Sequence, residues 1–145
     1  VVSRRLDLPL MSKLAQTANE TPLWLVHGPD TDDTLKRAWQ GVGATLISSA
    51  LDGSHLDLRS ALEGLAAQGL TRVFCEGGGA LAASLLRAGL VDELVGFTAG
   101  LALGAEGYPS VGALGLERLA NAPKMRLRST RAVGPDVMHV WERTS

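Results

Sequence analysis

The sequence has little cysteine: Cys75 is the single thiol among 145 residues. One thiol can form no internal disulfide and supplies no CxxC metal site, so a reducing cytoplasm is the expected location. No apolar run reaches the roughly 18 residues that a membrane-spanning helix needs. Arg4, Arg5 and Asp7 interrupt any apolar stretch of an N-terminal signal peptide. The sequence therefore predicts a cytoplasmic protein that does not enter the membrane.

Excess positive charge and recognisable catalytic motifs are also missing. The formal net charge is −1, whereas a nucleic-acid-binding surface needs clustered lysine and arginine, so no nucleic-acid partner is expected. His27, His55 and His139 show no metal-ligand spacing, and no metal site is expected. No GxSxG motif is present, which leaves a serine hydrolase without support.

What the sequence does contain is an alternation of short apolar runs with amphipathic segments. A length of 145 residues predicts one domain. We expect strands at residues 1–2, 23–27, 44–47, 72–76 and 92–98, with helices at 9–18, 31–40, 57–68 and 81–89. Residues 124–133 and 137–141 flank Gly134-Pro135-Asp136, which indicates a β-hairpin of the longer-loop kind. The pattern predicts an α/β fold with a mostly parallel, doubly wound sheet closed by a C-terminal antiparallel hairpin.

Some local details sharpen this expectation. Leu23–His27 is apolar throughout, as expected for a strand covered on both faces. Thr31 is expected to cap the helix over 31–40, and Asp57 the helix over 57–68, with Gly69 ending the latter. Cys75 lies inside an apolar run and is expected to be a buried, unreactive thiol.

Glycine makes up 17 of the 145 residues, and the most informative cluster is Gly77-Gly78-Gly79. It joins a predicted strand to a predicted helix, where bare backbone amides and the positive end of the helix dipole can bind an anion such as phosphate. The alternative is that the glycines only make a tight turn. Residues 77–82 also match a loose dinucleotide fingerprint, but the region 96–99 lacks the acidic residue that an ordinary Rossmann site needs.

Polar residues follow several predicted strands, where ligands bind in open α/β sheets. A carboxylate at Glu76 suits an amine or ring N–H donor, or it is an acidic residue favoured by a helix N-terminus. Ser3-Arg4 and Ser48-Ser49 follow other strands and could meet an anionic or ribose group, or they are solvated turn residues.

The segment Phe74-Cys-Glu-Gly-Gly-Gly-Ala-Leu-Ala-Ala-Ser-Leu-Leu-Arg-Ala-Gly-Leu-Val-Asp-Glu-Leu94 closely resembles the reductase domain of the bifunctional riboflavin-biosynthesis deaminase/reductase. The opening Val1–Pro9, the stretch 99–104, the segment 115–119 and the ending 136–141 resemble the same family. The resemblance implies a dihydrofolate-reductase-like three-layer α/β/α fold. The family's domain begins before the position of Val1, so it also implies an N-terminally truncated domain without the upstream deaminase.

The resemblance also implies an activity and its residues. The reaction is the NADPH-dependent reduction of 5-amino-6-(5-phosphoribosylamino)uracil, whose open-chain ribose imine accepts a hydride and becomes a ribitylamino group. Glu76 is implied to contact the pyrimidine substrate. The implied cofactor-binding residues are Gly77, Gly78, Gly79, Ala80, Leu81, Ala82, Ala83 and Ser84, together with Ser3 and Arg4 near the adenosine end of NADPH. No proton donor is assigned.

Other functions stay open at this point. One alternative is a nucleotide-binding or assembly module of that reductase without turnover. Another is a dihydrofolate-reductase-like reductase of a different pterin or pyrimidine. The apolar loop 100–115 and the hairpin edge could support a homodimer, as family members often pair.

Overall fold

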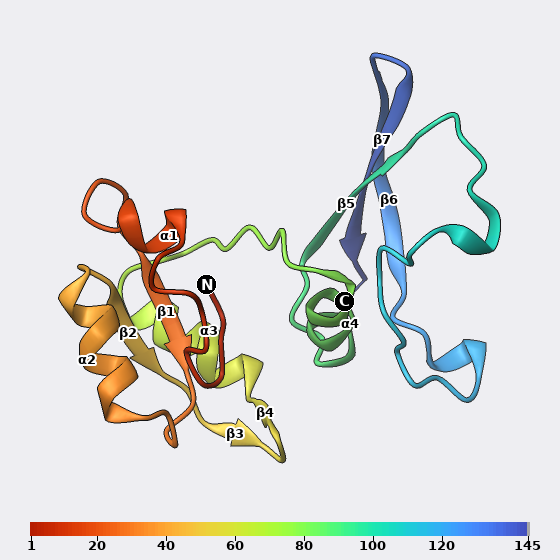
Figure 1. Cartoon of the computed structure of the whole chain (residues 1–145). Helices are drawn as coiled ribbons and strands as arrows, with labels where there is room; N and C mark the ends of the chain where they lie inside the picture. Colours follow the sequence, from red (N-terminus) through yellow and green to blue (C-terminus); the bar gives the residue numbers. More distant parts are fainter. Residues whose placement is uncertain (145) are drawn as a thin grey trace. The chain divides into compact units, whose positions relative to one another are not determined.

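The computed structural model describes residues 1–144 and divides the chain into two compact units, Val1–Val73 and Phe74 to the C-terminus (Figure 1). The first unit contains α1 (Lys13–Gln16), β1 (Trp24–His27), α2 (Asp33–Gly41), β2 (Thr45–Ser48), β3 (Leu51–Asp52), β4 (His55–Leu56) and α3 (Leu58–Ala67). The second contains α4 (Gly79–Arg87), β5 (Glu93–Thr98), the 3-10 turns η1 (Gly104–Glu106) and η2 (Leu119–Asn121), β6 (Met125–Val133) and β7 (Asp136–Arg143). The expectation of one domain over 1–145 stays a prediction.

The sheet of the first unit is parallel. β1 and β2 pair from Trp24 opposite Thr45 to His27 opposite Ser48. Val2 forms a parallel bridge with Val26 on the other side of β1, and the amide of Ser3 donates to the carbonyl of Val26 over 2.9 Å. The first residues of the chain therefore pair as a strand would, as their apolar character predicts.

β1 is buried on both of its faces. Successive side chains of a strand point to opposite sides, so Leu25 and Val26 lie in different apolar clusters. Leu25 packs in one apolar cluster with Trp39 of α2. Val26 packs in a second cluster with Ile47 of β2 and Ala61 of α3. The expectation of a strand covered on both faces is confirmed.

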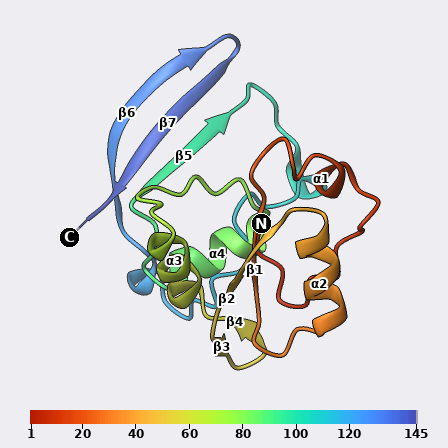
Figure 2. The same cartoon turned by 90° about the vertical axis from the view of Figure 1, so that its left-hand side faces the viewer.

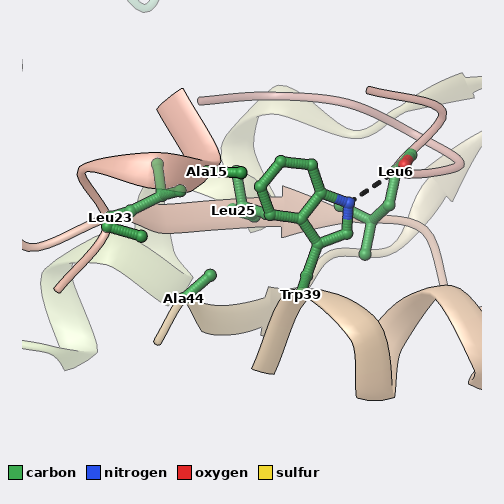
Figure 3. Packing of buried hydrophobic residues seen from close by; sticks show 7 residues of the cluster. Leu6, Ala15, Leu23, Leu25, Trp39 and Ala44 are labelled. Atoms are coloured by element: carbon green, nitrogen blue, oxygen red, sulfur yellow. Dashed lines mark hydrogen bonds between the residues drawn. The ribbon is translucent and has the colours of Figure 1, made fainter. Parts of the chain in front are cut away.

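Trp39 is the centre of the larger cluster. Its side chain is fully buried, and its indole Nε1 donates a hydrogen bond to the carbonyl oxygen of Leu6 over 3.3 Å (Figure 3). Leu6 is itself fully buried and has a φ of 56°, a left-handed conformation that is uncommon for leucine. The indole bond satisfies the carbonyl of this strained residue and joins the loop before α1 to α2.

Two aspartates cap the long helices of this unit. The side chain of Asp57 accepts from the amides of Arg59 and Ser60, as predicted for α3. For α2 the predicted cap is wrong by one residue. Asp32 is the N-cap and accepts from Thr34 and Leu35, because the hydroxyl of Thr31 is used by the backbone of the preceding loop.

The first helix is shorter than the pattern predicts. α1 covers Lys13–Gln16 and not the whole of 9–18. The amide of Ser12 closes a turn on the carbonyl of Pro9, and the amides of Glu20 and Thr21 close further turns on Thr17. Local turns therefore replace the outer ends of the expected helix, while Ala15 and Ala18 still reach the core.

The sheet of the second unit is antiparallel, with β7 between β5 and β6 (Figure 2). β5 pairs with β7 from Glu93 opposite Glu142 to Thr98 opposite Val137. β6 and β7 form the predicted hairpin, but Val133 pairs with Asp136, so the turn holds two residues and is not of the longer kind. Gly134 has a φ of 60° in this turn, a conformation that glycine adopts readily.

The predicted strand 72–76 is wrong. Residues 71–78 have no ladder partner in the described chain, and their side chains are exposed. An isolated extended segment cannot satisfy its backbone groups by a ladder, whatever its β-propensity. Within residues 1–144 the chain therefore forms three small sheets, one of them parallel, in place of a mostly parallel doubly wound sheet.

Candidate functional site

The glycine cluster leads directly into α4. Gly78 is the N-cap residue, with φ −62° and ψ 168°, and no side chain caps the helix. Its carbonyl accepts from the amides of Leu81 and Ala82 at 3.0 and 3.2 Å. The amides of Gly78, Gly79 and Ala80 find no acceptor among residues 1–144. The helix therefore begins with three open donors at the positive end of its dipole.

The three glycines have different surroundings. A Cβ on Gly79 would lie 3.0 Å from the carbonyl oxygen of Pro109 and 3.1 Å from the amide of Gly112, and that amide donates to the Gly79 carbonyl over 2.8 Å. A Cβ on Gly77 would lie 2.7 Å from the side chain of Leu81. A Cβ on Gly78 would meet nothing within 4 Å. Close backbone packing thus explains Gly79, whereas a Cβ on Gly77 would displace only the end of a leucine side chain, and the space beside Gly78 is open.

The other residues expected to bind the cofactor support this turn. Ala83 is buried, and Leu81 and Ala82 are half-buried along α4. The hydroxyl of Ser84 donates to the carbonyl of Ala80 over 3.0 Å and accepts from Arg87 over 3.2 Å. Open backbone donors are therefore confined to the start of the predicted segment 77–84, and its later residues hold the helix in shape.

Glu76 directly precedes the glycine cluster and is exposed. No cation within 4.0 Å pairs with its carboxylate in the described chain. Glu76 was predicted to end a strand, but the residues before it have no strand partner in the described chain. The carboxylate is available to accept hydrogen bonds from N–H groups of a ligand beside the open amides.

Cys75 is exposed, so the prediction of a buried thiol is wrong. The prediction relied on the apolar run 72–76 being a covered strand, and that strand is absent from the described residues. Its sulfur would lie 3.5 Å from a Cβ on Gly77, which places it against the same turn.

Ser3 and Arg4 belong to the first unit, where they follow the bridge at Val2. The Ser3 hydroxyl donates to Asp7 over 3.4 Å. Arg4 donates through Nη2 to Asp30 over 2.7 Å and through Nη1 to the carbonyl of Ser54 over 2.6 Å. Both residues lie at the carboxyl edge of the parallel strands, as predicted for groups that meet a ligand there.

The loop after β1 completes this edge. The sequence predicted no role for Asp30 there and predicted Thr31 only as a helix cap. Thr31 is buried and donates to the carbonyls of Arg4 and Gly28. The hydrogen bond from Arg4 lowers the pKa of Asp30 below its ordinary value, so Asp30 is ionised at neutral pH. The available signal was a run of polar residues, 30–33, directly after a buried strand.

Ser49, predicted as part of the same edge, is buried and donates to the carbonyl of Asp57 over 2.9 Å. Its hydroxyl binds the backbone at the start of α3, so Ser49 is a buried structural residue and not the solvated turn residue that the alternative predicted. In the described part of the chain, no three His, Cys, Asp or Glu side chains cluster as a metal site would require. No helix there is long and apolar enough to cross a membrane.

The fold is similar to solved reductase structures. The chain matches a pyrimidine reductase-like protein from Corynebacterium diphtheriae with a TM-score of 0.78 and 18% identity, covering 99% of this chain and 60% of that one. It matches RibD from Acinetobacter baumannii with a TM-score of 0.77 and 21% identity, covering 99% and 36%. These likenesses define the class: an α/β fold shared with RibD-like reductases.

Sequence comparison identifies the family. The model of the RibD C-terminal domain matches residues 1–139, and the chain belongs to this family. The riboflavin biosynthesis protein RibD of Escherichia coli K12 is 40% identical over 101 residues, 70% of this chain and 27% of the relative. RibD of Actinobacillus pleuropneumoniae is 27% identical over 140 residues, 95% of this chain and 37% of the relative. The chain thus spans about a third of the length of these relatives, and the resemblance read from the sequence is confirmed.

Proposed function

We propose that this chain is an NADPH-binding reductase domain that acts on 5-amino-6-(5-phosphoribosylamino)uracil. Membership of the RibD C-terminal domain family supports the reaction class. One observation carries the binding site: the start of α4 has three open backbone donors beside Gly78, where no protein atom fills the space that a Cβ would take.

The residues at this turn suit a dinucleotide. A diphosphate accepts hydrogen bonds and is favoured by the positive end of a helix dipole. The amides of Gly78, Gly79 and Ala80 would hold it, with Gly77 and Leu81 to Ser84 fixing the turn. NADPH, when bound, supplies a hydride to the substrate.

Glu76 would hold the pyrimidine. Its carboxylate is exposed next to the open amides and has no cation partner in the described chain, so its oxygens are available to the amino and ring N–H groups of a uracil derivative. Ser3 and Arg4 would contact the adenosine end of the cofactor, Arg4 through the charge that a 2′-phosphate requires.

A titration of the full chain with NADPH tests the binding site. At a free NADPH concentration one hundred times its Kd, binding stabilises the folded chain by about 2.7 kcal/mol, which a thermal melt detects. Gly78→Val should abolish this stabilisation, because a β-branched side chain would occupy the space beside the open amides. Gly100→Val is the matched control, since a Cβ on Gly100 also meets nothing within 4 Å.

The same preparation distinguishes the alternative functions. Loss of NADPH absorbance with the ribosylaminouracil substrate supports the proposed reaction. Binding without turnover would favour a nucleotide-binding or assembly module, and turnover only with another pterin or pyrimidine would favour a reductase of that compound. Equal stabilisation of the wild type and of Gly78→Val by NADPH would contradict the assigned site.

A further inference from the structure

Among residues 1–144, one backbone hydrogen bond joins the first turn of α4 to a distant segment. The amide of Gly112 donates it to the carbonyl oxygen of Gly79 over 2.8 Å. No side chain caps the helix at Gly78, and the residues before it have no ladder partner in the described chain. The loop that contains Gly112 is therefore the external support of this turn, and both lie within the second unit.

The contact between the loop and the helix leaves no room for side chains. A Cβ on Gly112 would lie 3.1 Å from the Gly79 carbonyl oxygen and 3.4 Å from Cα of Ala80. A Cβ on Gly79 would lie 3.1 Å from both the carbonyl oxygen of Ser110 and the nitrogen of Gly112. Glycine on each side therefore lets the two backbones approach closely enough to form the bond.

This bond acts on one of the three open donors of the turn. The carbonyl of Gly79 and the amide of Ala80 belong to the same peptide group, which is planar. A hydrogen bond that fixes the direction of the carbonyl therefore also fixes the direction of the Ala80 N–H. The bond also polarises the peptide group, and a polarised N–H donates more strongly to another acceptor. Gly112 thus acts, through Gly79, on a donor of the proposed diphosphate site.

We propose that Gly112 is a positioning residue that orients the Ala80 amide toward a bound diphosphate. The inference rests on the proposed function and deepens it, because it makes the loop 109–112 the support of the binding site. If the loop only stabilised the fold, a bond to any part of α4 would serve equally well. The observed bond instead reaches the peptide group that carries an open donor.

The test compares Gly112→Ala with a control glycine of the same unit, both in the full chain. The added methyl group would push the loop away from α4, so the Kd for inorganic pyrophosphate, measured by NMR titration, should rise about tenfold. The Kd for NADPH should rise by a similar factor. Gly96→Ala is the control, since a Cβ there would lie 2.2 Å from the His139 ring in the sheet. This variant should lose stability and keep both Kd values.

Hydrogen exchange of the wild type, followed by NMR, does not depend on how the variants fold. The amide of Gly112 should exchange more slowly than the open amides of Gly78 and Ala80, because it is hydrogen-bonded. Pyrophosphate should slow exchange at all three positions. Slower exchange at Gly78 and Ala80 without any change at Gly112 would overturn the role of Gly112 and leave the proposed function standing.

The remaining outcomes separate the inference from the function beneath it. An unchanged Kd in folded Gly112→Ala would overturn the inference alone. Equal rises in Gly112→Ala and Gly96→Ala would assign the effect to general destabilisation and would also overturn it. If neither NADPH nor pyrophosphate alters the amides of residues 78–80 in the wild type, the proposed function fails, and the inference fails with it.

Discussion

The two units of the chain bury their side chains very differently. Ten of the eleven buried hydrophobic residues described lie in the first unit, and Ala83 is the one in the second. The second unit instead exposes large apolar side chains, including Phe74, Phe97 and Leu101. The first unit is held by helices packed on a parallel sheet, and the second by strand pairing. Hydrophobic burial therefore contributes most of the stability of the first unit and a smaller part of the second.

The largest effect is expected from the core of the first unit. Trp39→Ala removes a fully buried indole and its hydrogen bond to Leu6, and it should lower the free energy of unfolding by about 3–5 kcal/mol. Chemical denaturation followed by circular dichroism measures this loss. Leu119→Ala, at a side chain 89% exposed in the second unit, is the control and should have little effect. Equal losses of unfolding free energy in Trp39→Ala and Leu119→Ala would contradict the difference in hydrophobic burial between the two units.

A smaller effect is expected at the tight backbone contact of the second unit. Gly79→Ser would place a Cβ 3.0 Å from the Pro109 carbonyl and should destabilise the chain by about 1–3 kcal/mol. Gly78→Ser adds the same side chain where nothing lies within 4 Å, at an N-cap position that favours serine, and should leave the stability unchanged. Similar melting temperatures for the two variants would show that the loop 109–112 does not pack on α4 as described.

The smallest effect concerns pH and the first unit. The hydrogen bond from Arg4 lowers the pKa of Asp30, and the amides of Thr34 and Leu35 lower that of Asp32, from an ordinary value of 3.8. The unfolded chain then binds more protons than the folded chain just below pH 3.8, so both groups stabilise the fold above that pH and lose their contribution as the pH falls through their folded pKa values. Unfolding curves between pH 5 and 2 measure this, and the double variant Asp30→Asn/Asp32→Asn should have a shallower acid transition. An acid transition as steep as that of the wild type would contradict the lowered pKa values of Asp30 and Asp32.

The accuracy of the sequence-based fold prediction also differs between the two units. Periodicity correctly located β1, α2 and α3, and Asp57 was correctly identified as the cap of α3, because these signals lie within or next to the residues of each element. The segment 72–76 has the same apolar character as β1, yet it is not a strand here. Whether an extended segment becomes a strand depends on a partner that its own residues do not encode. The hairpin was found because both of its strands and its turn are local, although its turn length was not.

The candidate site was predicted in part for a related reason. The glycine cluster and Glu76 could be read from adjacent residues, and so could the position of Ser3 and Arg4 at a strand end. The pairing of Arg4 with Asp30 could not be predicted, because 26 residues separate the two in the sequence. They are brought together by non-local contacts, which are the bridge at Val2 and the hydrogen bonds from Gly28 and Thr31 to the Arg4 carbonyl. For the same reason no local pattern indicated that Thr31 would bind the Arg4 carbonyl and leave the helix cap to Asp32.

The buried leucine with left-handed backbone, Leu6, stands two positions after Arg4. Residues 4–6 therefore connect the Arg4 guanidinium at the sheet edge to the hydrophobic core that contains Leu6. Substitutions that repack the core around Trp39 would shift Leu6, and with it the backbone of Arg4. A redesign of this core for thermal stability should therefore check that the Arg4–Asp30 ion pair still forms.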